Sequence, residues 1–317
     1  MPIHYASLDR ELKDVVRSKL THQGATWYVH ATNGSDGDTG KTWDSAFLTM
    51  QQAFDNLSSG DTIIFAGKIK EQLTTPVQVF DVTIIGSGNR PRHADDAPTP
   101  VGGKTSATWT YPTSPTAATP LLKVMQQGWR FVNILWAGVT TANDGNACVQ
   151  LYRDAEADDA ERDASHAEFI DCRFASGYHG IRDTGGCYGV LVKGNRFSAL
   201  EGYCILGVGN IGQGQTQWVI EDNHFSGFTN GAKIAAFECR IKGNTFSDGG
   251  TPNTTVVLNT NNGGGANNFV IDNAFQTATA NFNTPDVVGT STDVWFNISI
   301  DATSAGVGGN YEAGQPA

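Results

Sequence analysis

The stretch "RIKGNTFSDGG" (residues 240–250) contains one copy of a motif that recurs along the chain. Five segments align without gaps: "FIDCRFAS" (169–176), "VKGNRFSA" (192–199), "IEDNHFSG" (220–227), "IKGNTFSD" (241–248) and "VIDNAFQT" (270–277). Each copy starts with an apolar residue and has a phenylalanine five positions later: Phe174, Phe197, Phe225, Phe246 and Phe275. Two positions before it, the first copy has Cys172 and the other four have an asparagine: Asn195, Asn223, Asn244 and Asn273.

The motif is constant, but the spacing between its copies is not. Successive phenylalanines are 23, 28, 21 and 29 residues apart, which is typical of stacked coils whose loops vary in length. The Asp-Asn and Gly-Asn pairs favour a tight turn with positive φ. Stacked coils lie about 4.8 Å apart, so the phenylalanines would stack inside and the asparagine amides would form a hydrogen-bonded ladder. The sequence therefore predicts an all-β chain folded as a single-stranded parallel β-helix.

The region before the repeats, residues 26–72, has the pattern of a strand, a polar loop, a helix, a turn and a second strand. Asp44 or Ser45 is placed to cap this helix. Its apolar face would consist of Ala46, Phe47, Met50, Ala53, Phe54 and Leu57. Because the open end of a coil stack exposes unpaired strand edges, we expect the helix to cover that end.

The same region resembles the N-terminal module of right-handed parallel β-helix proteins of the pectate-lyase-like superfamily. The matching residues are Val29, Gly34-Ser35-Asp36, Trp43, Ala46, Gln52-Ala53, Asp55 and Gly60-Asp61-Thr62-Ile63. With the repeats, the resemblance covers residues 26–300 and implies that the coils are right-handed. Enzymes of that superfamily carry calcium-binding carboxylates with an arginine base, or clustered aspartates. Neither arrangement is matched here, and one fold hosts many functions.

The chain divides into four expected segments. They are an N-terminal helical segment (1–25), the start of the β-helix with its capping helix (26–60), the parallel β-helix (61–300) and a C-terminal tail (301–317). In the first segment, one apolar stripe at helical spacing contains Leu8, Leu12, Val15, Val16 and Leu20. This helix either packs on the body, or serves self-association or docking to a larger assembly. Residues 86–120 are expected to form a long loop or irregular coil on the surface. The acidic stretch 153–163 is expected to be a solvated loop or a short helix outside the stack, with a divalent-cation site as the alternative.

Composition limits the partners. A net charge of −11 disfavours binding to nucleic acid or an anionic membrane. No apolar run is long enough to cross a bilayer, and no signal peptide is visible at the start. Five cysteines without a CxxC pair indicate buried free thiols rather than disulfides or a zinc site. We therefore expect a soluble product folded in a cytoplasm, with neither a metal nor a cofactor.

Candidate catalytic residues are few. Asp171, Asp222 and Asp272 precede an asparagine or Cys172 in the repeats, and two coils would separate neighbouring members by about 9.6 Å, near the upper limit for inverting glycosidases. A tight turn explains these aspartates equally well. A fourth candidate acid is Asp183, in "GYHGIRDTGG" (177–186).

Candidate sugar-binding residues occur in two places. Tyr178, His179 and Arg182 of "GYHGIRDTGG" could hold a sugar by stacking and hydrogen bonds, or act as acid and base. The alternative is a glycine-rich bend with solvated polar groups. Trp109 and Tyr111, in a Pro/Thr-rich segment, are expected at the surface, where they could contact carbohydrate.

Two functional hypotheses follow. In the first, the chain is a structural or adhesive component of a bacteriophage particle (tail spike, fibre or capsid decoration). Within the superfamily, it most resembles the β-helix proteins of bacteriophage virions. It would be made in the host cytoplasm, assemble as a homotrimer, contact other virion proteins through its N-terminal segment and bind host surface polysaccharide. In the second, it is a polysaccharide lyase or glycoside hydrolase. A bacterial surface β-helix that binds carbohydrate is a further alternative, and the sequence favours a role without catalysis.

Overall fold

A computed structural model describes residues 24–88, 107–154, 162–207, 215–234, 236–247, 256–258, 268–277, 292–295, 297–301 and 309–311. The stripe from Leu8 to Leu20, most of the acidic stretch and most of the C-terminal tail therefore lie outside the described residues. Among the residues described, no helix has the length and apolar content needed to cross a bilayer.

The described chain forms three long sheets and one small one. Sheet A contains β1 (Thr26–His30), β2 (Thr62–Ala66), β5 (Thr83–Gly86), β8 (Arg130–Val132), β11 (Glu168–Ile170), β14 (Leu191–Lys193), β18 (Val219–Glu221), β22 (Arg240–Lys242), β25 (Asn268–Ile271) and β27 (Thr292–Trp295). Sheet B contains β3 (Lys68–Lys70), β6 (Thr108–Thr110), β9 (Leu135–Ala137), β12 (Arg173–Gly177), β15 (Arg196–Leu200), β19 (His224–Ser226), β23 (Thr245–Ser247), β26 (Ala274–Thr277), β28 (Asn297–Asp301) and β29 (Gly309–Tyr311). Sheet C contains β4 (Leu73–Thr74), β7 (Leu122–Val124), β10 (Ala147–Leu151), β13 (His179–Asp183), β16 (Tyr203–Gly207), β20 (Asn230–Ile234) and β24 (Val256–Leu258), while β17 (Gln215–Thr216) pairs with β21 (Ala236–Phe237).

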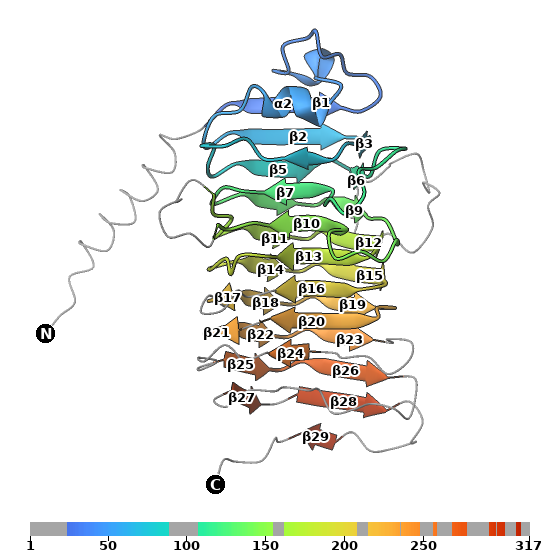
Figure 1. Cartoon of the computed structure of the whole chain (residues 1–317), viewed down its shortest axis with the longest axis vertical. Coiled ribbons are helices and arrows are strands. Elements are labelled where there is room, and N and C mark those ends of the chain that lie inside the picture. Colours follow the sequence, from blue (N-terminus) through green and yellow to red (C-terminus); the bar gives the residue numbers. More distant parts are fainter. Residues whose placement is uncertain are drawn as a thin grey trace, which may run out of the picture.

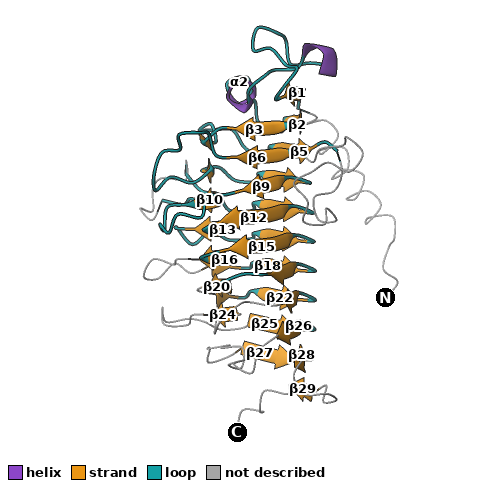
Figure 2. Ribbon diagram, turned by 90° about the vertical axis from the view of Figure 1, so that its right-hand side faces the viewer, coloured by secondary structure: helices purple, strands orange, loops and turns teal. Residues whose placement is uncertain are grey.

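The chain winds through sheets A, B and C in turn, and each coil stacks on the one before it (Figures 1 and 2). Among the described strands, each strand of the coils pairs in parallel with its equivalent in the next coil, and β29 alone runs antiparallel, on β28. Parallel crossover connections of this kind are right-handed. The predicted right-handed parallel β-helix is therefore confirmed.

The predicted phenylalanine stack lies inside sheet B. Phe174, Phe197, Phe225 and Phe246 pair in register. Their ring centroids are 4.8, 4.8 and 4.4 Å apart, and neighbouring planes are within 7° of parallel. The backbone of Phe275 continues the register beside Phe246; its side chain lies outside what the structure describes. Removing several rings of this size from water is a major contribution to the stability of the stack.

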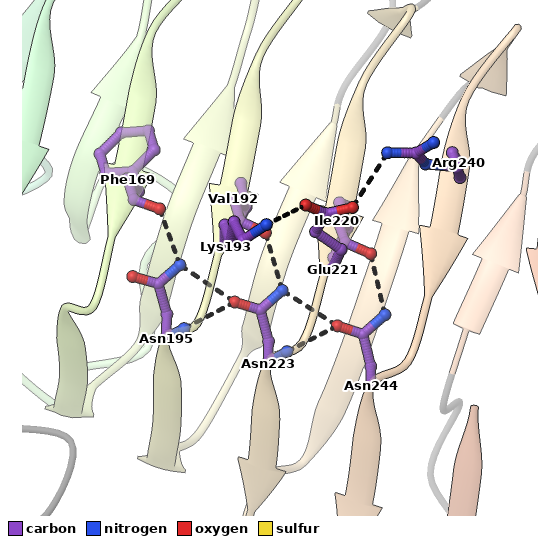
Figure 3. Close-up of polar contacts among 9 residues, drawn as sticks. All are labelled: Phe169, Val192, Lys193, Asn195, Ile220, Glu221, Asn223, Arg240 and Asn244. Carbon is purple, nitrogen blue, oxygen red and sulfur yellow. Dashed lines mark hydrogen bonds and ion pairs between the residues drawn. The ribbon is translucent and has the colours of Figure 1, made fainter. Parts of the chain in front are cut away.

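The asparagine ladder is also confirmed (Figure 3). Asn195, Asn223, Asn244 and Asn273 are all buried. The Asn223 Oδ1 accepts from the backbone N–H and the Nδ2 of Asn195, at 2.8 and 3.0 Å. Its own Nδ2 donates to Val192 O and to Asn244 Oδ1, at 2.8 and 3.0 Å. Each buried amide is thereby satisfied by the adjacent coils, as buried polar groups must be.

The residue before each ladder asparagine, or before Cys172 in the first copy, makes the turn between sheets A and B. The φ angles are 52° at Asp171, 67° at Gly194, 57° at Asp222, 65° at Gly243 and 55° at Asp272. Glycine and aspartate are among the residues that tolerate this left-handed region. The predicted turn is therefore present in all five copies of the motif.

The N-terminal end of the stack carries the covering helix, which differs from the expected one. The helix α2 is only Met50–Phe54, and a 3₁₀ turn, η1 (Trp43–Ser45), precedes it. Thr49 caps α2 and Thr42 caps η1, so the expectation that Asp44 or Ser45 caps the helix was wrong. Met50, Ala53 and Phe54 bury their side chains at the end of the core, where α2 lies across the first coil (Figure 1).

Candidate functional site

Three of the candidate acids occupy the turn between sheets A and B. Asp171, Asp222 and Asp272 all have positive φ, and they alternate along the turn with Gly194 and Gly243. A Cβ atom on Gly243 would lie 2.8 Å from Asp222 Oδ1. The structural role predicted for these aspartates is thus present, and the alternation with glycine leaves room for each carboxylate.

Asp183 lies in the interior rather than at a reactive surface. Its side chain is fully buried at the end of β13. It accepts hydrogen bonds from the backbone N–H groups of Gly185 (3.0 Å) and Cys187 (2.9 Å) and from Gln215 Nε2 (2.7 Å). Burial raises the pKa of this carboxyl, and these donors oppose the shift. Asp183 was one of the candidate acids, and its burial away from solvent disfavours that role.

The two aromatic residues expected at the surface are also buried. Trp109 is inaccessible, stacks on Trp136 with ring centroids 5.1 Å apart, and donates from Nε1 to Glu71 O. Tyr111 is 7% exposed, and its hydroxyl donates to backbone oxygens of Thr119 and Ala147. The predicted glycan contacts of Trp109 and Tyr111 were wrong, because β6 continues the aromatic core into this coil.

The third group of candidates does come together, at the start of the sheet C strands. Here the structure forms what we call the His179 cluster, which consists of Asp144, Tyr178, His179, Arg182 and Tyr203. The His179 ring lies 4.5 Å from the Tyr178 ring and 5.9 Å from the Tyr203 ring, measured between centroids. Its Nε2 is 3.8 Å from Asp144 Oδ1, and the Asp144 side chain is 80% exposed. The cluster therefore borders solvent although His179 itself is 1% exposed.

The tautomer of His179 follows from one backbone contact. The N–H of Tyr203 donates to His179 Nδ1 at 3.0 Å, so Nδ1 carries no proton and Nε2 carries the proton of the neutral ring. Burial lowers the pKa of His179 to about 4; Arg182 lowers it further, and Asp144 opposes the shift. At neutral pH the ring is therefore an uncharged donor whose Nε2–H, within the described residues, has no hydrogen-bond partner.

Arg182 supplies positive charge beside this donor. It projects from the outer face of sheet C, in register with Gln150 and Leu206. Burial lowers its pKa and Asp144 raises it, and among the described residues its Nε has no hydrogen-bond partner. Two coils further on than Arg182, Lys233 Nζ lies 5.9 Å from the centre of the Tyr203 ring, within cation–π range.

Chemically, the cluster offers two partly exposed aromatic rings, a partly exposed guanidinium and an exposed carboxylate around a buried N–H donor. This combination suits the stacking and hydrogen bonding of a sugar ring. No three His, Cys, Asp or Glu side chains among the described residues gather as metal ligands.

Sequence reasoning missed Asp144, Tyr203 and Lys233. Tyr203 lies six residues after Phe197, whereas His179 lies five residues after Phe174. A gapless alignment of the repeats therefore puts Tyr203 and His179 out of register by one position. Asp144 belongs to an irregular loop without periodic signal. A gapped alignment of the sheet C strands would have found Tyr203.

Comparisons with known proteins add the following. No family model and no curated protein sequence matches the chain. Among solved structures, a GH136 lacto-N-biosidase from Eubacterium ramulus has 9% identity and a TM-score of 0.48, over 91% of this chain and 60% of that one. A rhamnogalacturonan lyase has 14% identity and a TM-score of 0.37, over 90% of this chain and 65% of its own. The Dettilon tailspike protein has 11% identity and a TM-score of 0.35, over 86% and 62% respectively. This chain thus spans less than two thirds of each of these structures, and its fold is established by its own strand pairing.

Proposed function

We propose that this chain is a structural and adhesive component of a bacteriophage particle (a tail spike, fibre or capsid decoration). In this proposal it presents a rigid β-helix and binds host surface glycans at the His179 cluster. The observation that carries the adhesive role is the hydrogen bond from Tyr203 N–H to His179 Nδ1. It holds the His179 ring, whose Nε2–H is itself buried, between the partly exposed rings of Tyr178 and Tyr203 and near the partly exposed Arg182. These partly exposed groups are suited to stacking on a sugar and to binding its hydroxyl or carboxylate.

Two further observations support a presenting rod. Stacked aromatic rings and the asparagine ladder join consecutive coils along sheet B and the adjoining turn, so neighbouring coils hold one another rigid. All five cysteines are buried free thiols, which fits folding in a reducing compartment such as the host cytoplasm. Assembly as a homotrimer is part of the same proposal.

A polysaccharide lyase or glycoside hydrolase is the competing proposal, and the approach of Asp144 to His179 favours it. A histidine base, however, needs an unprotonated nitrogen facing the substrate. Here the unprotonated Nδ1 is occupied by Tyr203 N–H, and the other ring nitrogen, Nε2, carries the proton and is buried. The same geometry therefore favours binding over proton abstraction.

The proposal is tested by measuring the binding of the full chain to a panel of purified bacterial capsular and O-antigen polysaccharides by isothermal titration calorimetry. We expect one glycan to bind, and Arg182→Gln to weaken that binding at least tenfold. The matched control is Arg173→Gln, an arginine on the outer face of sheet B, which should leave the affinity unchanged. Equal loss in both variants, or no binding to any glycan, contradicts the adhesive role.

A parallel assay separates binding from catalysis. Release of reducing ends or of unsaturated products from the bound glycan, abolished by Asp144→Asn, would establish the enzyme instead. For the particle itself, we expect mass spectrometry of purified virions to detect the chain and light scattering to give a trimer. Its absence from virions that carry all their other proteins would overturn the assignment to a particle.

A further inference from the structure

An apolar column runs along the outer face of sheet A. Tyr28, Ile64, Ile85, Val132 and Ile170 are paired in register on five consecutive strands. Their neighbours in each strand point into the core and are buried, whereas these five are partly exposed. We call these residues the sheet A column. Outward positions of a solvated sheet are usually polar, so five consecutive apolar ones indicate a face that something covers.

The column has a defined start and end. At the N-terminal end, Trp43 is 42% exposed and its ring lies 5.0 Å from that of Tyr28, so the apolar surface continues onto η1. At the other end, the next positions in register are the charged residues Lys193, Glu221 and Lys242. Four inter-strand steps of about 4.8 Å give the column a length of about 19 Å.

One segment of the chain matches this length and chemistry. The apolar stripe of residues 1–23, which lie outside the described residues, extends from Leu8 to Leu20. As an α-helix these twelve steps of 1.5 Å measure about 18 Å. The stripe ends only eight residues before Tyr28, and the intervening residues lead directly into β1, the first strand of sheet A.

We propose that residues 8–20 form an amphipathic helix that packs lengthwise on the sheet A column of the same molecule. Leu20 lies beside Tyr28, and Leu8 reaches the coil of Ile170. This direction places Asp9 and Glu11, near the start of the helix, toward Lys193, which is exposed and also pairs with Glu221 at 2.6 Å. The short connection favours the segment of the same chain over that of a second copy, because five linking residues span at most about 18 Å.

Cysteine cross-linking of the full chain tests both contact and direction. The pair Leu8→Cys with Ile170→Cys should oxidise to an intramolecular disulfide in most molecules. Two control pairs keep Leu8→Cys and should not cross-link: Ile64→Cys lies at the opposite end of the column, and Ala175→Cys lies in the same coil but on the outer face of sheet B. The native cysteines are all buried, and burial raises the pKa of the Cys148 and Cys172 thiols to about 12, so they should not compete.

The alternative results each overturn the proposal. A disulfide between two chains would show that a second copy supplies the helix, and cross-linking only through Ile64→Cys would reverse its direction. No cross-link in any pair would show that another partner covers the column. A second measurement avoids engineered thiols: hydrogen exchange of amides 8–20 should accelerate at least tenfold in Ile85→Glu and remain unchanged in Ser226→Glu, on the outer face of sheet B.

Discussion

At each ladder position, an asparagine side chain matches the hydrogen-bond donors and acceptors that the adjacent coils present. Asn223 uses both lone-pair directions of its oxygen and both hydrogens of its nitrogen, and every partner belongs to an adjacent coil. Neither a hydrocarbon nor a carboxylate can reproduce this set, because the site needs two donors and two acceptors on one planar group. The ladder therefore stabilises the fold, and its hydrogen bonds form only when adjacent coils are in register.

Replacing Asn223 by Asp should destabilise the fold by about 3 kcal/mol at pH 7, because a buried carboxylate would face two acceptors. The loss should diminish at low pH, since a protonated carboxyl regains one donor. Urea unfolding followed by circular dichroism measures both effects. The control is Asp222→Asn, one residue earlier in the turn, which should stay within about 0.5 kcal/mol of the parent. A destabilisation equal in the two variants would contradict the ladder.

His179 should make stability depend on pH. Its pKa is lowered to about 4 in the folded state from about 6.5 in the unfolded chain. Between these values the unfolded state binds the additional proton, so stability is retained above pH 6.5 and falls as the pH decreases toward 4. At pH 4 the loss should be on the order of 3 kcal/mol relative to His179→Asn, whose amide oxygen can still accept from Tyr203 N–H.

The pH comparison must be made against that variant because Asp183 acts in the opposite direction. Because its pKa is raised in the folded state, the folded state binds a proton at Asp183 more readily than the unfolded state does. The contribution of Asp183 to stability therefore grows as the pH falls. Parallel unfolding midpoints for the parent and His179→Asn from pH 7 to pH 4 would show that His179 is not the titrating group.

Repeat spacing predicted the side chains whose partners are their own equivalents one coil away. Phe225 and Asn223 were placed correctly for that reason, since each contacts the equivalent residue in the adjacent coils. Trp109 and Asp183 were not, because their burial depends on how non-repeated strands meet, which periodicity does not encode. The same limit explains why Tyr178, His179 and Arg182 were found without Asp144.

At the level of elements, the left-handed turns determine where the coil bends. The turn between sheets A and B alternates aspartate and glycine, and the spacing of Asp222 and Gly243 shows why: a Cβ on the glycine would lie 2.8 Å from Asp222 Oδ1.

The covering helix α2 is bounded by side chains that are distant in the sequence. Asp36 accepts from the N–H groups of Leu48 and Thr49, and Glu71 accepts from those of Met50 and Gln51. Because Asp36 and Glu71 lie outside the helical segment, the local sequence pattern alone predicted a longer helix than α2.

The turn alternation predicts an energetic coupling between Asp222 and Gly243. Gly243→Ala should cost more than Gly227→Ala, because both have positive φ but a Cβ at Gly227 meets nothing closer than 3.9 Å. We expect about 1 kcal/mol for Gly227→Ala, from backbone conformation alone. The additional loss in Gly243→Ala should disappear in an Asp222→Gly background, and a double-mutant cycle in urea measures that coupling. Strict additivity would contradict the steric explanation.

The whole molecule behaves as a one-dimensional stack, so its stability is a sum of coil and interface contributions. Each interface in the middle of the rod includes a phenylalanine pair, a ladder hydrogen bond and three strand pairings. The His179 cluster lies by sheet C and the sheet A column on the outer face of sheet A, whereas the aromatic stack lies inside sheet B. We therefore expect substitutions at the partly exposed residues of the cluster or of the column to leave the aromatic stack intact.

The same separation predicts how the rod fails when its centre is broken. Phe225→Ala removes a ring that stacks on both Phe197 and Phe246, and the cavity should cost about 3–5 kcal/mol. Since coupling passes only between adjacent coils, hydrogen exchange should accelerate from β18 to β26 while β1 to β11 keep their protection. Phe269→Ala is the matched control, because its side chain is 44% exposed on the outer face and should leave exchange unchanged. Uniform acceleration along the whole chain would mean that the stack unfolds as a single unit.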